Sequence, residues 1–507
     1  MSRATVASVL ASFALLCGCG TTVGTTGSAT SAVEGQLTAP NNTAGPTGNT
    51  AAGGAGSAPV TGNTSNTTGG QSSATSTAGV TTSNTMGSTT SRTATSGSRT
   101  GGLVPANSPG VTDKYVYYGV PYSSQAAAED RAAGVAGAAP SYDTRDVNNA
   151  VVKYANAHGG FAGRQLVPIY YDYNATTDRN TQDQSACATY TQDHKVFALD
   201  AQTSTILDSC AEKAGAIPIG TGPFTSYQRF PHLIDPDEIR LDRLGTVTTN
   251  GLYRAHYFTG RLGLVTWDDP AYHYTIDHGY LPALAAHGVK VWQTAYITVP
   301  QTVGAISDSG AAVSSAIAHF RALGIDHVII QDGQIGVFSG GGLTLQWMDE
   351  SESQHYYPRY GQNAYNFPGE TELPADQQNH ALAIDFVDSD PRYDVGWHPN
   401  KARELCFKIE ADAGMPVSSG NSNDEAIAGA ACDLVFFLQR MLDGVSVISA
   451  DNGIQAAENL GTSFKSAIVY GTKLIPGRRD GGDMFRTEEY FASCQCLKFQ
   501  GQPYWAD

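Results

Sequence analysis

From residue 115 onward, short apolar runs alternate with stretches in which apolar residues recur at helical spacing. Strand-like runs cover residues 115–120, 166–171, 196–199 and 216–219, and helical stretches lie between them at 147–155, 182–192 and 204–214. Strands that alternate with helices imply right-handed βαβ units and a parallel sheet with both faces covered. The pattern therefore predicts a first α/β lobe, which we assign to residues 111–245.

The same alternation restarts in the middle of the chain. Strand-like runs at 262–267, 289–297 and 327–330 are separated by helical stretches at 274–287 and 311–323, and this set predicts a second lobe over residues 246–385. Residues 386–507 contain helical stretches near 402–413 and 425–442 and a strand-like tail at 496–499. We expect this last part to complete lobe two and to return to lobe one.

The N-terminus carries an export signal. Arg3 precedes an apolar stretch, 6–16, which is shorter than the roughly 20 residues that a membrane-spanning helix needs. Leu16-Cys17-Gly18-Cys19 resembles the bacterial lipobox, in which the last Cys becomes the lipidated N-terminus of the mature protein. An ordinary secretory signal with two incidental thiols is the alternative. We expect residues 1–18 to be a lipoprotein signal peptide and Cys19 to hold the chain, lipid-anchored, at the extracytoplasmic face of the cell membrane.

Residues 19–110 consist almost wholly of Gly, Ser, Thr, Ala, Asn and Pro, with hardly a bulky apolar side chain. Such a segment cannot bury enough apolar surface to offset the entropy lost on ordering it. The composition therefore predicts a disordered tether between the lipid anchor and the two lobes.

Charge and motifs exclude several function classes. The net charge of -17 argues against nucleic acid as a partner, because phosphate binding needs clustered Lys and Arg. No P-loop, H-E-x-x-H, G-x-S-x-G or C-x-x-C motif is present in the sequence. Gly220-Thr221-Gly222 follows a strand, but Thr225 stands where the third glycine of a dinucleotide turn belongs. We therefore expect no catalytic residues, no cofactor and no metal.

Six cysteines follow the signal: Cys187, Cys210, Cys406, Cys432, Cys494 and Cys496. An even number in an exported chain favours disulfides. Close spacing favours Cys187 with Cys210 and Cys406 with Cys432, each pair lying on neighbouring predicted helices, although sequence alone does not fix the connectivity. A metal site at Cys494-Gln495-Cys496 is disfavoured because no His or further Cys stands at ligand spacing.

Polar loops directly follow several predicted strands, where open α/β sheets bind their ligands. Each polar residue in these loops has a simpler interpretation as a helix cap or a turn. Taken together, the loops give a candidate ligand-binding set of Ser123, Gln125, Gln202, Thr203, Ser204, Thr221, Gly222, Phe224 and Thr225 in lobe one and Asp269, Tyr272 and Asp332 in lobe two.

One segment carries a family resemblance. Asn156-Ala157-His158-Gly159-Gly160-Phe161-Ala162-Gly163-Arg164 resembles the Asn-x-x-Gly-Gly-x-x-Gly-[Arg/Lys] signature of type I periplasmic binding proteins, and the branched-chain amino acid-binding group looks closest. Asp268-Asp269-Pro270-Ala271-Tyr272 resembles the family's Asp-rich loop at the start of lobe two. The resemblance covers about residues 113–500. It implies two flavodoxin-like lobes with parallel sheets, joined by a three-strand hinge, with the ligand cleft between the lobes.

The resemblance also implies a function and roles for single residues. In amino acid binders of this family, hydroxyls of lobe one hold the carboxylate and an acid of lobe two holds the ammonium. By position, Thr203, Ser204, Thr221 and Thr225 would take the first role and Asp332 the second, with Tyr272 as a wall. Phe224 stands where such binders have a small or hydroxylated residue, so an aromatic or amide-bearing solute fits this chain as well as an amino acid does.

The expected molecule is thus a monomeric, non-enzymatic solute-binding lipoprotein. It would capture a small solute by hinge closure and deliver it to the permease of an ABC importer. The alternative function is a ligand sensor or a cell-envelope interaction protein with the same fold and no role in transport.

Overall fold

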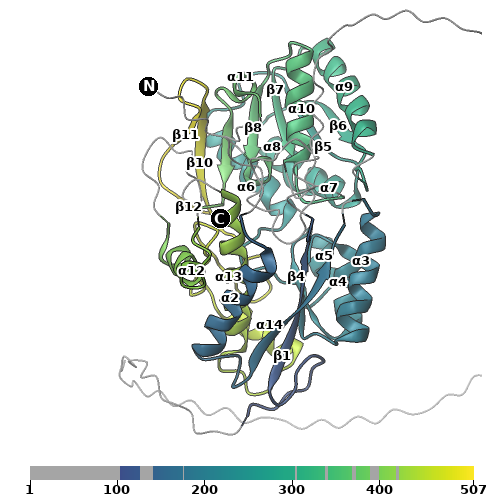
Figure 1. Ribbon diagram of the computed structural model, residues 1–507. Coiled ribbons are helices and arrows are strands. Elements are labelled where there is room, and N and C mark those ends of the chain that lie inside the picture. Colours follow the sequence, from purple (N-terminus) through teal and green to yellow (C-terminus); the bar gives the residue numbers. More distant parts are fainter. Residues whose placement is uncertain are drawn as a thin grey trace, which may run out of the picture. The chain divides into compact units, whose positions relative to one another are not determined.

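The computed structural model describes residues 103–125, 141–174, 176–302, 305–336, 341–367, 373–388, 399–417 and 422–506 (Figure 1). All of these residues belong to one compact unit of the chain. The predicted signal peptide, the predicted lipidation site Cys19 and most of the predicted tether lie outside the described residues. Within the described ranges, no helix is both long enough and apolar enough to cross a membrane.

Lobe one is built on a four-stranded sheet, as the alternation of strands and helices predicts. Its strands are β1 (Tyr115–Tyr122), β2 (Gln165–Asp172), β3 (Ala198–Gln202) and β4 (Ile217–Gly220). All pairs are parallel and the order is β2-β1-β3-β4. The connecting helices are α2 (Thr144–Ala157), α3 (Arg179–Ala188), which continues into a π-helical turn (Thr189–Asp193), and α4 (Thr205–Ala214). A short α5 (Phe224–Arg229) follows β4.

Lobe two contains a larger sheet. Its parallel part has the order β6-β5-β7-β8-β9 and consists of β5 (Leu262–Trp267), β6 (Val291–Ile297), β7 (His327–Gln331), β8 (Arg359–Asn363) and β9 (Leu382–Asp385). The helices of this lobe are α6 (Leu241–Arg254), α7 (Pro270–Thr275), α8 (Leu281–Ala286), α9 (Ile306–Ala322), α10 (Gly342–Ser353) and the short α11 (Ala375–Gln378). The predicted helix 274–287 is divided, because a π-helical turn (Ile276–Tyr280) joins α7 to α8.

The chain after β9 contributes to both lobes. It first returns to lobe one, where α12 (Lys401–Asp412), α13 (Ser422–Leu442) and α14 (Ala450–Glu458) share one apolar core with β1 and α2. It then adds three antiparallel strands to the sheet of lobe two, β10 (Met484–Phe491), β11 (Cys496–Phe499) and β12 (Tyr504–Trp505). Residues 386–507 thus reach lobe one first and lobe two afterwards.

The end of the predicted tether is attached to lobe one. Asn107 N donates to the carbonyl of Ile448 (2.8 Å), and the buried Arg164 side chain donates to the carbonyls of Val104 (2.8 Å) and Thr112 (2.5 Å). Arg164 is the last residue of the Gly-Gly-x-x-Gly-Arg motif. The motif therefore fixes the point at which the chain enters the folded unit, and residues 104–112, most of which were predicted to belong to the tether, contact lobe one.

Three crossover segments join the lobes and hydrogen-bond to one another. Asp235 in the first segment donates through its amide to the carbonyl of Arg479 in the third (2.9 Å), and the amide of Gly481 donates back to the carbonyl of Asp235 (2.8 Å). The second segment leaves β9 and pairs with the third, with the amide of Tyr470 donating to the carbonyl of Phe386 (3.0 Å). This arrangement is the three-strand hinge that the resemblance implies.

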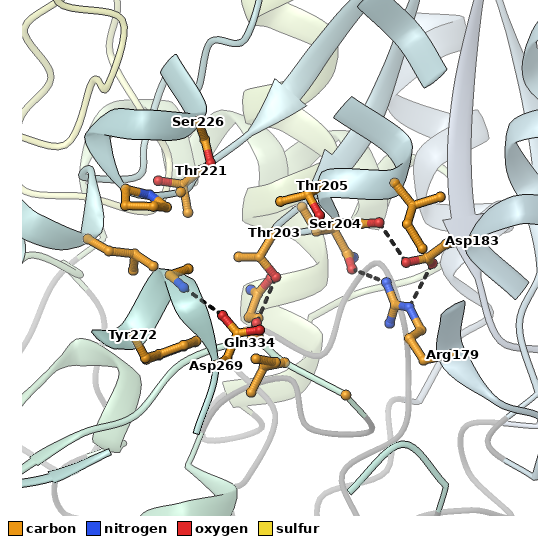
Figure 2. Close-up of a pocket in the computed structure, with 18 of the residues that line it drawn as sticks. Arg179, Asp183, Thr203, Ser204, Thr205, Thr221, Ser226, Asp269, Tyr272 and Gln334 are labelled. Carbon is orange, nitrogen blue, oxygen red and sulfur yellow. Dashed lines mark hydrogen bonds and ion pairs between the residues drawn. The ribbon is translucent and has the colours of Figure 1, made fainter. Parts of the chain in front are cut away.

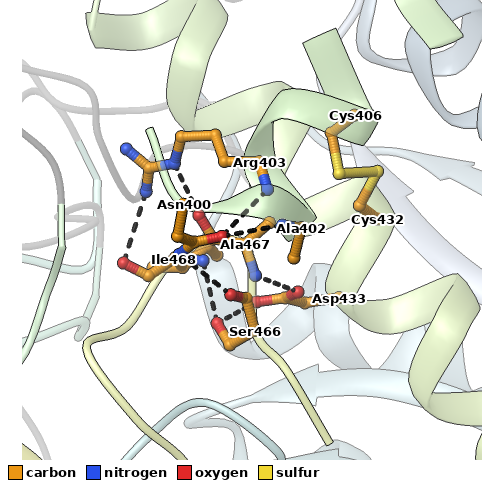
Figure 3. The surroundings of a disulfide bond; sticks show 9 residues. All are labelled: Asn400, Ala402, Arg403, Cys406, Cys432, Asp433, Ser466, Ala467 and Ile468. Atoms are coloured by element: carbon orange, nitrogen blue, oxygen red, sulfur yellow. Dashed lines mark hydrogen bonds between the residues drawn. A yellow bond between two sulfur atoms is a disulfide. The ribbon is translucent and has the colours of Figure 1, made fainter. Parts of the chain in front are cut away.

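Disulfides connect neighbouring helices within lobe one. Cys187 on α3 is joined to Cys210 on α4, as their spacing favours. Cys406 on α12 is joined to Cys432 on α13 (Figure 3), again as their spacing favours. A third disulfide joins Cys494 to Cys496 across one residue of the β10–β11 turn.

Candidate functional site

The carboxyl ends of the parallel strands converge on one cavity. In each sheet the strand order reverses at the first strand, since β1 lies between β2 and β3, and β5 lies between β6 and β7. Ligands of open α/β sheets bind beyond the carboxyl ends of the strands at such points. Loops of both lobes enclose a cavity of about 210 Å³ there (Figure 2). An apolar cavity of about 150 Å³ accommodates benzene, so this cavity suits a solute with one ring or a short side chain.

Residues from both lobes line the cavity. Lobe one contributes the first turn of α3, the loop between β3 and α4, and the loop after β4: Arg179, Asn180, Asp183, Gln202, Thr203, Ser204, Thr205, Ile206, Thr221, Gly222, Pro223 and Ser226. Leu241 at the start of α6 and the loops after β5, β6 and β7 complete the lining with Asp269, Ala271, Tyr272, Gln301, Gln334, Ile335 and Gly336.

The lobe one wall is a hydrogen-bonded network around Asp183. Arg179 Nε donates to Asp183 Oδ1 (2.8 Å), and the hydroxyl of Ser204 donates to Asp183 Oδ2 (2.6 Å). A second guanidinium nitrogen of Arg179 donates to Gln202 Oε1 (3.2 Å). Because Arg179 neutralises Asp183 and Ser204 also caps α4 by accepting from Leu207 N (3.2 Å), this wall is polar, rigid and without excess charge.

A tight backbone approach positions the two loops of this wall. Gln202 has a positive φ of 52°, and its carbonyl accepts from the amide of Thr221 (2.7 Å). A Cβ atom at Gly220 would lie 2.1 Å from the same carbonyl oxygen, so only glycine permits the contact. The hydroxyls of Thr203 and Thr221 are thereby held at neighbouring points of the cavity wall.

The lobe two wall combines an acid with an aromatic ring. Asp269 caps α7, with its Oδ1 accepting from the amide of Ala271 (2.8 Å). Tyr272, on the first turn of α7, is 2% exposed, and its hydroxyl has no hydrogen-bond partner among the described residues. Burial raises the pKa of this phenol well above its ordinary value. Gly333 makes room for the hydroxyl, because a Cβ there would lie 2.2 Å from it.

The two lobes are in direct contact beside the cavity. The hydroxyl of Thr203 donates to the carbonyl of Gln334 (2.7 Å), and the amide side chain of Asn180 donates to Gln301 Oε1 (3.4 Å). Figure 2 shows the Thr203–Gln334 contact across the cavity mouth. The first contact comes from the loop before α4 and the second from the first turn of α3, and each reaches a loop of lobe two, so the cavity as described depends on the two lobes being together.

The structure brings seven of the predicted residues to the cavity: Gln202, Thr203, Ser204, Thr221, Gly222, Asp269 and Tyr272. It places Phe224 and Thr225 elsewhere, because they form the exposed first turn of α5 and the Phe224 ring packs under the guanidinium of Arg240 (4.7 Å). Ser226, the next residue of the helix, lines the cavity instead.

Ser123 and Gln125 also lie outside the lining. They belong to the loop after β1, where the hydroxyl of Ser123 accepts from the amide of Gln125 (3.2 Å) and the neighbouring Ser124 hydroxyl donates to Asp172 (2.7 Å). These local contacts orient the loop along the end of β2, away from the cavity.

Asp332 has a structural position and does not line the cavity. It is 0% exposed, and its two oxygens accept from the indole of Trp267 (3.0 Å), the amide of Gly333 (2.8 Å) and the amide and hydroxyl of Thr344 (both 2.9 Å). Burial is the main cause that raises its pKa, to about 6, and the hydrogen bonds oppose the increase. Asp269 is therefore the lobe two acid that a solute in the cavity would meet.

Several lining residues were not among the predicted set. Arg179, Asn180 and Asp183 begin the helix after β2, and Gln301 follows β6. Each lies in the segment that follows a parallel strand, although Arg179, Asn180 and Asp183 are separated from the end of β2 by a loop. The interaction of Arg179 with Gln202, 23 residues later, has no counterpart in the local sequence pattern.

Several solved structures of transporter substrate-binding proteins have a fold similar to that of this chain. An ABC transporter substrate-binding protein from Desulfitobacterium hafniense, in complex with Leu, has 15% sequence identity and a TM-score of 0.50 over 76% of this chain and 99% of its own. A solute-binding protein from Rhodopseudomonas palustris, in complex with p-hydroxybenzoic acid, has 12% identity and a TM-score of 0.54 over 78% of this chain and 97% of its own. A branched-chain amino acid ABC transporter protein from Thermus thermophilus with bound valine has 14% identity and a TM-score of 0.53, over 77% and 96%.

The chain has the type I periplasmic binding protein fold. No protein-family model and no curated protein sequence matches the chain. The type I fold agrees with the resemblance carried by the Gly-Gly-x-x-Gly-Arg segment and with the order of elements in both lobes. Among the residues that the structure describes, no group of three or more His, Cys, Asp or Glu side chains is arranged to hold a metal ion.

Asp200, on β3 in lobe one, is a buried acid. Its titration should make the free energy of unfolding depend on pH. Burial, reinforced by the charge of Asp235, raises the pKa of Asp200 to about 8, and its Oδ2 has no hydrogen-bond partner among the described residues. The unfolded chain releases this proton near pH 4, so the folded state binds more protons between about pH 4 and 8 and its stability falls as the pH rises through that window. From pH 6 to 8 the loss is about 2 kcal/mol.

The substitution Asp200→Asn should remove this loss, because an amide of the same shape keeps the acceptor for the amide of Gln202 (3.1 Å) and does not titrate. Urea unfolding of both proteins at pH 6 and pH 8 measures the difference, and Asp113→Asn provides a control at an exposed acid. Identical pH profiles for the wild type and Asp200→Asn would show that Asp200 does not retain its proton in the folded state.

Proposed function

We propose that this chain is an extracytoplasmic solute-binding receptor that captures one small solute by closure of its two lobes. The observation that carries the proposal is the cavity of about 210 Å³ at the carboxyl ends of both parallel sheets, lined from both lobes and bordered by the Thr203–Gln334 contact. A solute held between two half-sites stabilises the closed form through contacts that the open form lacks. Solute capture and lobe closure are then one event.

The lining favours a solute with a polar head and a flat or aliphatic body. The hydroxyls of Thr203, Ser204 and Thr221 already donate within the protein, so they can accept from an amide or ammonium N–H of the solute. The guanidinium of Arg179, which carries several N–H donors, can bind a carboxylate, and Asp269 can bind an ammonium or hydroxyl group. The ring of Tyr272 offers an apolar face, and its hydroxyl has no hydrogen-bond partner in the part of the chain that the structure describes. We propose an amino acid, an amide or an aromatic acid, which is also the range covered by the leucine, valine and p-hydroxybenzoic acid complexes of proteins with the same fold.

Attachment and delivery complete the proposal. The lipobox-like Leu16-Cys17-Gly18-Cys19 would hold the receptor at the membrane surface through lipid on Cys19, and the Gly-, Ser- and Thr-rich segment after it would serve as the tether. A receptor in that place delivers its solute to an ABC permease in the same membrane. The similar proteins described as parts of ABC transporters support this assignment.

A thermal-shift screen of the full chain against amino acids, amides, polyols and aromatic acids tests the proposal. A solute at 100 times its Kd stabilises the folded state by about 2.7 kcal/mol, which raises the melting temperature by a few degrees. A hit supports the receptor and identifies the solute class. A cooperative melting transition that no compound shifts would oppose solute capture and favour a sensor or envelope-interaction role.

With a solute identified, Thr203→Val should weaken its binding about fivefold. Valine has the shape of threonine but cannot donate to the carbonyl of Gln334, and one hydrogen bond contributes about 1 kcal/mol. Isothermal titration calorimetry measures the change. Thr191→Val, which removes a hydroxyl from the same lobe outside the cavity lining, should leave the Kd unchanged. Equal affinities for all three proteins would show that closure does not use the Thr203 contact.

A further inference from the structure

The three disulfides of the described chain differ in burial and span. Cys406 and Cys432 are 0% exposed, and Cys187 and Cys210, which join α3 to α4, are 23 positions apart in sequence. Cys494 and Cys496 are two positions apart, and Cys494 is exposed at the tip of the β10–β11 hairpin. The first two cross-links join separate helices, whereas the third joins residues that the turn already holds together.

A cross-link across one residue adds little stability. The stabilisation from a disulfide grows with the number of residues that it closes into a loop, because it acts mainly on the unfolded chain. The Cys494–Cys496 disulfide encloses a single residue, Gln495. Gln495 has a φ of 52°, a left-handed conformation that residues other than glycine disfavour. A role as a structural staple therefore does not account for this disulfide.

The hairpin does not depend on the disulfide for its position. Strand β10 pairs with β9 on one side and with β11 on the other, through Glu488↔Phe499 to Phe491↔Cys496. The buried side chains of Tyr490 and Leu497 pack together beneath the hairpin. The turn itself is held by two long backbone hydrogen bonds, from the amides of Cys494 and Gln495 (both 3.3 Å). Opening the disulfide would therefore leave the strands paired and free only the turn.

We propose that Cys494–Cys496 is a thiol–disulfide exchange site for a dithiol partner. A thiolate of the partner attacks the exposed Sγ of Cys494, a new S–S bond forms, and the sulfur of Cys496 leaves as a thiolate and takes up a proton. The partner's second thiolate then displaces Cys494. The partner dithiol is oxidised to a disulfide by two electrons, and the hairpin is reduced to two thiols. The same steps in reverse reoxidise the hairpin.

Differential alkylation of the native full chain tests the site. The protein is exposed to dithiothreitol without denaturant, quenched with N-ethylmaleimide at successive times, digested and analysed by mass spectrometry. Cys494 and Cys496 should be alkylated at least tenfold faster than Cys187, Cys210, Cys406 and Cys432. Simultaneous alkylation of all six disulfide-bonded cysteines, or alkylation only in denaturant, would overturn the proposal.

Electron transfer is measured separately with a reduced dithiol peptide as the probe. The oxidised wild-type chain should convert one equivalent of the peptide to its disulfide. The double variant Cys494→Ser/Cys496→Ser, which retains the other two disulfides, should convert none and should melt within about 3 °C of the wild type. Peptide oxidation by the variant at the wild-type rate would assign the exchange to another cysteine pair and so contradict the proposal.

Discussion

Replacing Arg243 with alanine should lower the free energy of unfolding by about 3–5 kcal/mol, the usual effect of removing one partner from a buried ion pair. Arg243 lies on the first turn of α6 and is 15% exposed, and its guanidinium contacts Asp480, which is 1% exposed, and Asp483, which is 0% exposed. Without Arg243, Asp480 would keep the amide of Arg240 (3.1 Å), and Asp483 would keep Arg478 (2.8 Å). One buried negative charge would therefore lose its counterion.

The location of this network gives the substitution a functional consequence. Asp480 and Asp483 belong to the third crossover segment, and Arg243 ties that segment to the start of α6, directly after the first crossover. Loosening the crossovers should broaden the range of lobe orientations and so reduce solute affinity as well as stability. Urea unfolding followed by tryptophan fluorescence measures the stability.

Lys408→Ala is the matched control, because Lys408 and Asp412 form an exposed i,i+4 pair (2.5 Å), and such pairs contribute only about 0.3–0.5 kcal/mol. A loss for Arg243→Ala no larger than that of the control would show that the crossover ion pairs do not stabilise the hinge.

The strands and helices with regular apolar spacing were predictable from sequence. Helix α6 and strand β10 were not, because contacts with distant parts of the chain determine them. β1 to β7 are apolar runs between helical stretches, so local pattern identifies them. Helix α6 was not predicted, because its sequence is rich in Gly and Thr, which are poor helix formers. Its glycines permit close packing, since a Cβ at Gly245 would lie 2.8 Å from the Tyr280 ring and one at Gly251 would lie 2.5 Å from Ile384. Tertiary packing therefore determines this helix.

Strand β10 illustrates the same limit for a sheet. Its sequence contains adjacent glutamates, yet Glu488 is buried, where its Oε1 accepts from the hydroxyl of Tyr470 (3.1 Å). A hydrogen-bond partner from a distant part of the chain makes a charged residue compatible with an interior strand. Sequence pattern alone counts such a residue as polar and therefore as surface.

At the candidate site, most of the cavity could be located from the rule that ligand-binding loops follow parallel strands. The rule did not distinguish side chains that face the solute from side chains with a structural role. Asp332 satisfies the rule, yet its carboxylate is occupied by Trp267 and Thr344, 65 and 12 residues away. Asp269 satisfies it equally and lines the cavity. The difference depends on tertiary partners, which local sequence does not specify.

Removing the Cys406–Cys432 disulfide by replacing both cysteines with alanine should lower the free energy of unfolding by about 3.5 kcal/mol, from the chain entropy of the loop that it closes. The two cysteines are 26 positions apart and fully buried in the lobe one core. Figure 3 shows that the disulfide joins α12 to α13 beside Arg403, whose guanidinium donates to the carbonyls of Ala467 (2.5 Å) and Ile468 (3.3 Å) at the start of the third crossover.

The same cross-link therefore fixes the helix pair on which the crossover rests. Asp433, next to Cys432, accepts from the amide of Ala467 (2.7 Å), so both helices bind the crossover backbone. Replacing Cys494 and Cys496 with alanine is the control, since a three-residue loop contributes only about 1.6 kcal/mol in the same chain-entropy relation. Unfolding in urea without reductant compares the two double variants with the wild type. Equal losses for both would mean that loop length does not govern the contribution of these disulfides and that packing of the sulfur atoms does.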